Sequence, residues 1–133
     1  AKLPKPIIDG KSIVNLIKGN SDKSPQEAYY FYMGRQLQAI RMGNWKLHFP
    51  HGYRTMAGKP GGKGGIPTKY SQTRIGVSLF DLDKDIGETT DVKEKHPEIL
   101  AKMQQLGEAM RTELGDNKRQ GKGQRQPGRL AAR

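Results

Sequence analysis

The segment RQLQAIRMGNWKLHF, residues 35–49, limits the possible folds of this 133-residue chain more than any other. Gly43 and Asn44 separate two stretches in which apolar and polar residues alternate, and glycine at the first central position favours a two-residue hairpin turn. One face of the returning strand carries Trp45, Leu47 and Phe49. The opposite face carries Lys46 and His48. We therefore predict an antiparallel hairpin that is apolar on one face.

Three further segments complete a small α+β fold. AYYFYM, residues 28–33, is rich in aromatic residues and is typical of a buried strand, and GVSLFDL, residues 76–82, reads as a fourth strand. A helix is expected over residues 97–114, because Pro97 suits its first position and Gly115 suits its end. Its apolar stripe is formed by Ile99, Met103, Leu106, Met110 and Leu114. The predicted architecture is a four-stranded antiparallel sheet packed by one C-terminal amphipathic helix.

The formal net charge of +11 raises the question of a polyanionic partner. Residues 118–133 hold six basic residues and residues 50–74 hold five, with no acid in either, so these two segments contain the whole excess. Residues 50–74 also contain six glycines and three prolines, which predicts a long irregular Gly-rich loop. We expect residues 116–133 to form a disordered basic tail that contributes little to folding. A free-standing basic module that binds nucleic acid or sulfated polysaccharide stays an alternative.

Three motifs suggest a phosphate-binding or metal-binding site, but their residues do not match the patterns that such sites require. GKPGGKGG fails the phosphate-loop pattern, because Gly64 stands where Ser or Thr is required. His48 and His51 lack the further ligands of a metal site, and DLDKDIGE, residues 81–88, departs from a calcium-binding EF-hand and is expected to hold a turn. The chain has no cysteine and no run of apolar residues long enough to span a membrane. We predict no catalytic residue, metal ligand or cofactor site in this chain.

The order of three segments is more informative than any one of them. IDGKSIVNLIKG, AYYFYMGRQLQAIRMGNWKLHF and SLFDLDKDIGETTDVKEKHPEILAKMQQLGEAM follow one another over about residues 7–115. Together they resemble the C-terminal part of the sulfatase family, the arylsulfatase-like sulfuric ester hydrolases. The residues that carry the resemblance are Ile8, Asp9, Gly10, Ala39, Ile40, Arg41, Gly43, Trp45, Lys46, Leu79, Phe80, Asp81, Leu82, Asp85, Glu88, His96, Pro97 and Glu98. The chain departs from the family at Ile86, where proline is usual, and at Asp91 and Val92, where Asn-Leu is usual.

The resemblance implies that the active centre lies outside this chain. The family's formylglycine forms from Cys or Ser in a [CS]-x-P-x-R motif, which is absent here, and the family's calcium site belongs to its N-terminal domain. The chain is then a C-terminal fragment of a hydrolase, and alone it should not hydrolyse sulfate esters. Residues 1–27 would be a linker that leaves the absent catalytic domain, residues 28–115 the C-terminal subdomain and residues 116–133 the tail. A periplasmic or secreted location is suggested by the family only.

The resemblance also assigns roles to individual residues. It places residues 50–74 near the sulfate ester, and its candidate substrate-binding residues are His51, Tyr53 and Arg54, since His and Arg form charge-assisted hydrogen bonds with anions. The residues expected to hold the fold or the domain interface are Arg41, Trp45, Lys46, Asp81, Asp85 and Glu88. The expected partner is the catalytic domain. We expect the apolar hairpin face, together with the aromatic strand at 28–33, to leave surface exposed for that domain.

Overall fold

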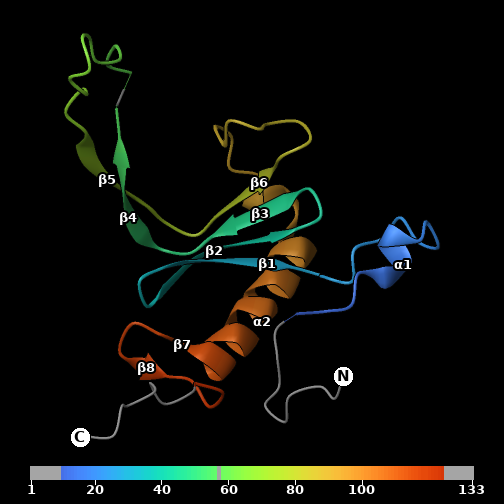
Figure 1. Cartoon of the computed structure of the whole chain (residues 1–133). Helices are drawn as coiled ribbons and strands as arrows, with labels where there is room; N and C mark the ends of the chain where they lie inside the picture. Colours follow the sequence, from blue (N-terminus) through green and yellow to red (C-terminus); the bar gives the residue numbers. More distant parts are fainter. Residues whose placement is uncertain (1–9, 57, 125–133) are drawn as a thin grey trace, which may run out of the picture.

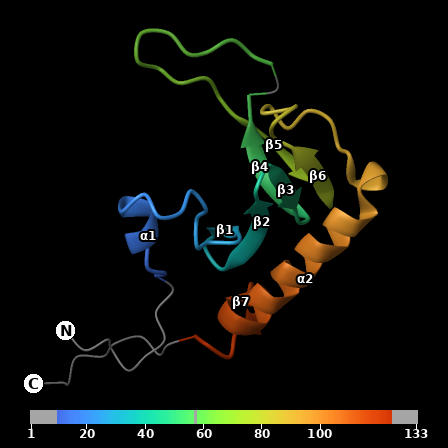
Figure 2. The same cartoon turned by 90° about the vertical axis from the view of Figure 1, so that its right-hand side faces the viewer.

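A four-stranded antiparallel sheet and one long helix form the body of the protein. The computed structural model describes residues 10–56 and 58–124. The sheet has the order β1-β2-β3-β6. Its strands are β1 (Tyr29–Met33), β2 (Gln36–Met42), β3 (Trp45–His48) and β6 (Ser78–Asp81). Helix α2 (Pro97–Leu114) lies along one face of this sheet (Figures 1 and 2), which confirms the predicted fold class.

The hairpin between β2 and β3 forms at the predicted turn. Gly43 has a φ of 58°, a left-handed conformation that glycine adopts at no steric cost, and Met42 pairs with Trp45 across the turn. The register places one row of side chains under the helix in all four strands: Tyr30, Ile40, Leu47 and Leu79. The last three of these are completely buried. The core therefore lies between this face of the sheet and α2.

The face with Trp45, Leu47 and Phe49 is covered, so our expectation that it is available to a partner is wrong. Leu47 is 0% exposed and Phe49 is 5% exposed. Phe49 lies against Gly107 of α2, where the missing side chain allows a close approach, and the Arg111 guanidinium lies 4.1 Å from the Phe49 ring centroid. Trp45 packs against the same core. A single helix suffices because glycine lets it approach the sheet closely.

Strand β1 is only half buried, although its composition predicted a buried strand. It is an edge strand of the sheet, and three of its side chains point away from α2 and are exposed: Tyr29, Phe31 and Met33. The intervening Tyr30 and Tyr32 pack against the core. The exposed aromatic surface therefore lies on the sheet face opposite α2.

The segment between β3 and β6 contains two strands that the sequence analysis missed. Strands β4 (His51–Thr55) and β5 (Ser71–Ile75) pair antiparallel as a separate two-stranded sheet, where an irregular loop was predicted from residue 50 to residue 74. This hairpin and its connection project beyond the body of the protein (Figures 1 and 2). Because β3 and β6 pair directly with each other, the whole segment is an insertion into one side of the sheet.

The C-terminal end of α2 is capped by the chain that follows it. Strands β7 (Gly115–Asp116) and β8 (Arg119–Gln120) form a short hairpin, so ordered structure extends past the tail boundary expected at residue 116. The last four helix carbonyl groups accept hydrogen bonds from the backbone of Gly115, Lys122 and Gly123 and from the side chain of Gln124. The remainder of the expected tail, residues 125–133, lies outside the described residues.

Within residues 10–28, the short helix α1 (Val14–Ile17) lies on the side of the sheet away from α2 (Figure 2). The apolar side chains of Val14 and Ile17 in this helix, and of Ile13 just before it, are exposed. A single 3-10 turn, η1 (Lys93–Lys95), leads into α2. No helix among the described residues has the length and apolar character that crossing a membrane requires.

Candidate functional site

A cavity of about 250 Å³ opens where β3, β4 and the turn after β6 meet. The residues that line it are His48, His51, Tyr53, Ile75, Gly87 and Glu88. His51 and Tyr53 are two of the three residues predicted to contact substrate. Arg54 does not line the cavity, because successive side chains of β4 point to opposite faces.

Glu88 connects the turn after β6 to the sheet face opposite α2. Its carboxylate accepts hydrogen bonds from Lys46 Nζ at 2.5 Å and from His48 Nε2 at 2.6 Å. Glu88 has a φ of 54°, which a non-glycine residue rarely adopts, and the two bonds hold it there. Burial alone would raise the pKa of Glu88, but the bonds from Lys46 and His48 outweigh it and lower the pKa overall. The site therefore contains a fixed, ionised carboxylate.

His48 is held as a neutral imidazole. Its Nε2 donates to Glu88, whereas its buried Nδ1 has no hydrogen-bond partner among the described residues. Protonation would place an unsatisfied N–H in this buried position. Burial lowers the pKa of His48 below its ordinary value, although the hydrogen bond and charge of Glu88 oppose the shift. His48 therefore orients the site as an uncharged ring whose proton lies on Nε2, toward Glu88.

His51 lines the cavity with a ring whose orientation is fixed. The side chain is 6% exposed, and its Nδ1 donates to the carbonyl oxygen of Phe49 at 2.7 Å. This bond fixes the ring, which stacks on His48 with 5.4 Å between centroids. Nε2 makes no hydrogen bond to another described residue, so in the neutral ring this atom is left as an acceptor. Tyr53 lies beside His51, with 6.3 Å between ring centroids, and is 43% exposed.

The remaining residues of the sequence prediction make contacts within this chain. Arg41 Nε donates to the carbonyl oxygen of Gly43, within its own hairpin. Trp45 packs on the core face, with its ring 4.6 Å from that of His96. Lys46 lies on the opposite face, where its Nζ is 5.2 Å from the Phe31 ring centroid. Arg41, Trp45 and Lys46 thus make contacts within this chain.

The acidic turn after β6 is satisfied by its own neighbours. The Asp81 carboxylate accepts hydrogen bonds from Lys84 Nζ and Asn44 Nδ2, both of which lower the pKa of Asp81. Asp85 accepts bonds from the backbone N–H groups of Thr89 and Thr90. Within residues 10–56 and 58–124, no three His, Cys, Asp or Glu side chains gather as metal ligands would. These carboxylates do not fit a calcium ion, because their oxygens already bond to amines and amides.

The cavity could be predicted only in part. The alternation of β3 places Lys46 and His48 on one face, but no sequence signal indicates that Glu88, 40 residues after His48, completes the group. The exposed Tyr29 and Phe31 lie on this same face, with 4.8 Å between their ring centroids. The sheet face opposite α2 therefore combines an apolar patch with a polar cavity.

Comparisons with known proteins agree with this architecture. Residues 24–129 match a family model described as the C-terminal region of aryl-sulfatase. The chain is also 28% identical over 121 residues to steryl-sulfatase of Mus musculus. That alignment covers 81% of this chain and 19% of the mouse protein, so the chain spans about a fifth of its relative.

Proposed function

Because this chain belongs to the aryl-sulfatase C-terminal region family, we propose that it completes a sulfuric ester hydrolase and forms one edge of its substrate cleft. The observation that carries the proposal is the cavity, which is lined by His51 and Tyr53 together with the hydrogen-bonded pair His48 and Glu88. The proposed substrate is a sulfate ester. No step of bond cleavage is assigned to this chain.

The proposed contribution of the cavity is binding and orientation. The His51 ring is fixed by its bond to the Phe49 carbonyl, and Nε2 of the neutral ring would accept a hydrogen bond from a substrate hydroxyl without further ordering of the side chain. The Tyr53 hydroxyl would donate a second hydrogen bond to a sulfate or hydroxyl oxygen. In the catalytic domain, the formylglycine and calcium implied by the family would supply the nucleophile and the charge stabilisation at sulfur.

The sheet face opposite α2 is the proposed contact with the catalytic domain. Its exposed side chains Tyr29, Phe31 and Met33 form an apolar patch next to the cavity. Burial of aromatic residues contributes strongly to interfaces. In this arrangement residues 1–27 would lead from the catalytic domain, and residues 28–115 would form the docked subdomain. Docking through this face would bring His51 and Tyr53 to the border between the two domains.

Tyr53→Phe in the intact enzyme tests the cleft role. Loss of one hydrogen bond should raise KM for a chromogenic aryl sulfate about three- to tenfold while kcat changes little, because the bond forms equally in the bound substrate and the transition state. Tyr70→Phe is the matched control, since Tyr70 is exposed in the same projecting segment and does not line the cavity. Equal KM values for both variants would contradict the cleft role.

The isolated chain is expected not to turn over an aryl sulfate, because it contains no [CS]-x-P-x-R motif. The measurement is hydrolysis of the same chromogenic substrate by a highly purified sample. Activity that persists through successive purification steps would contradict an accessory role and place catalytic groups within this chain.

A further inference from the structure

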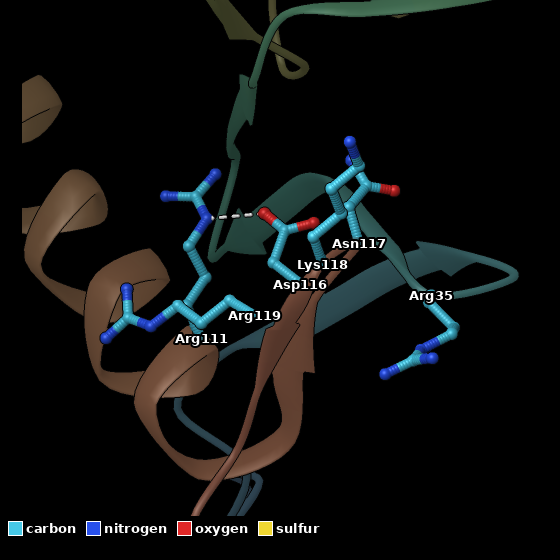
Figure 3. A pocket seen from close by; sticks show the side chains of 6 residues that line it. All are labelled: Arg35, Arg111, Asp116, Asn117, Lys118 and Arg119. Atoms are coloured by element: carbon cyan, nitrogen blue, oxygen red, sulfur yellow. Dashed lines mark hydrogen bonds and ion pairs between the residues drawn. The ribbon is translucent and has the colours of Figure 1, made fainter.

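A second pocket lies at the opposite end of α2 from His96 and contains mainly basic side chains. It has a volume of about 810 Å³ and lies between the turn that precedes β2 and the β7–β8 hairpin. The residues that line it are Arg35, Arg111, Asp116, Asn117, Lys118 and Arg119 (Figure 3). None of them belongs to the cavity described above, and the sequence indicated only Lys118 and Arg119, as part of the basic segment 118–133.

Hydrogen bonds between the β7–β8 hairpin and the sheet fix the walls of the pocket. The Asn117 N–H donates to the Arg35 carbonyl oxygen at 2.8 Å, and the Leu37 N–H donates to Asp116 Oδ1 at 3.1 Å. The Tyr32 hydroxyl donates to the Gly115 carbonyl oxygen. These three bonds fix the β7–β8 hairpin against the start of β2, so the positions from which the basic side chains extend are fixed relative to one another.

Two of the four cations in the pocket already have acidic partners. Arg111 Nε bonds to Asp116 Oδ2 at 2.7 Å, as Figure 3 shows, and Arg119 bonds to Glu108. No described residue is recorded as a partner of the side chains of Arg35 or Lys118. These two cations are also not needed to neutralise the end of α2, because its last four carbonyl groups are capped by other donors. The pocket therefore has an uncompensated positive charge that its own structure does not use.

We propose that this pocket binds sulfate ester groups of an anionic polysaccharide. Arg35 and Lys118, whose charged ends extend to different sides in Figure 3, would each contact the oxygens of a sulfate group, since guanidinium and ammonium groups form charge-assisted hydrogen bonds with oxyanions. The Asn117 side-chain amide, which has no recorded partner among the described residues, would bond to a neighbouring sugar hydroxyl. The choice of sulfate over other oxyanions rests on the proposed sulfatase function; the choice of an anionic ligand rests on the pocket alone.

The lining residues favour a glycan over a nucleic acid. Proteins that bind single strands combine a basic groove with aromatic side chains on which bases stack, and among the described residues no aromatic side chain lines this pocket. Each exposed ion pair strengthens binding only about two- to fivefold. One sulfate group should therefore bind weakly, and a polymer with repeated sulfate groups should bind more tightly because neighbouring groups rebind.

The test is a calorimetric titration of the full 133-residue chain with a dextran sulfate oligosaccharide, compared with unsulfated dextran of the same length. The variant Arg35→Ala/Lys118→Ala should bind dextran sulfate about tenfold more weakly. The control Lys18→Ala/Lys69→Ala removes the same charge from exposed positions that do not line the pocket and should change affinity less than threefold. Unsulfated dextran should not bind measurably.

Three results would overturn the proposal. Equal losses in both double variants would mean that binding follows total charge. Loss of binding only when residues 125–133 are deleted would place the site on that segment, which contains three further arginines. An oligonucleotide of equal charge that binds more tightly than dextran sulfate, with the same dependence on Arg35 and Lys118, would assign the pocket to nucleic acid. The Tyr53→Phe assay is independent of all three, so either proposal can fail alone.

Discussion

Gly107→Ala should destabilise this protein, although alanine favours helix over glycine. Helix propensity alone would stabilise the alanine variant by about 0.8–1.0 kcal/mol. A Cβ atom at this position would lie 2.4 Å from Phe49 Cζ and 3.2 Å from Ile40 Cδ1. Overpacking a core costs about 1–3 kcal/mol, and a contact this short belongs to the upper part of that range. We expect a net loss of about 2 kcal/mol in the free energy of unfolding.

Urea unfolding followed by circular dichroism measures this loss, and a thermal scan should show a midpoint roughly 8 °C lower. Ala109→Gly, on the exposed side of α2, is the matched control and should cost only the propensity difference of about 1 kcal/mol. Phe49→Leu should cost less in the Gly107→Ala background than in the wild type, because it makes room for the added methyl group. A Gly107→Ala variant more stable than the wild type would refute the close packing of helix on sheet.

Three other changes test separate parts of the structure. Glu88→Gln should lower the free energy of unfolding by about 1–2 kcal/mol at pH 7, whereas the exposed control Glu94→Gln should be neutral. The pKa of Glu88 is lower in the folded state than in the unfolded state, where it is about 4.3. Ionised Glu88 therefore stabilises the fold fully above about pH 4.3, and the difference in unfolding free energy between wild type and variant should vanish as the pH falls through the folded pKa. Trp45→Ala should destabilise the isolated chain by about 3 kcal/mol in a urea titration, since Trp45 packs on the helix-covered core; an unchanged midpoint would place it at the domain interface instead. Truncation after Gln124 should leave the thermal midpoint unchanged, whereas truncation after Asn117 should lower it, because the removed residues cap α2; equal midpoints would show that the cap contributes nothing.

Features with local signals were predictable from the sequence. Helix α2 begins at Pro97 and ends before Gly115 as expected, because proline favours the first helical position and glycine the end. The β2–β3 hairpin follows from the glycine at its turn and the alternation on either side. The order of the four sheet strands followed from an antiparallel meander. In each case the signal lies within a few residues of the feature it specifies.

Features that depend on distant contacts or polar strands were not predictable. The faces of β4 and β5 are largely polar, so the β-propensity of Tyr53, Thr55 and Thr73 was hidden among glycines and charges. The bridge from Glu88 to Lys46 spans 42 residues and depends on how the turn after β6 folds back. The close approach of α2 at Gly107 could not be foreseen, since a helical glycine more often indicates a weak helix than a tight contact.

Because β3 pairs directly with β6, the projecting β4–β5 segment lies outside the four-stranded sheet that forms the body of the protein. Lengthening a flexible connection costs little, about 0.6 kcal/mol for each doubling, so insertions there should be tolerated while the core stays intact. His51 is the exception, because it is buried at the base of the segment. A library that randomises residues 58–70 and retains His51 and Tyr53 should therefore preserve the four-stranded sheet and its helix.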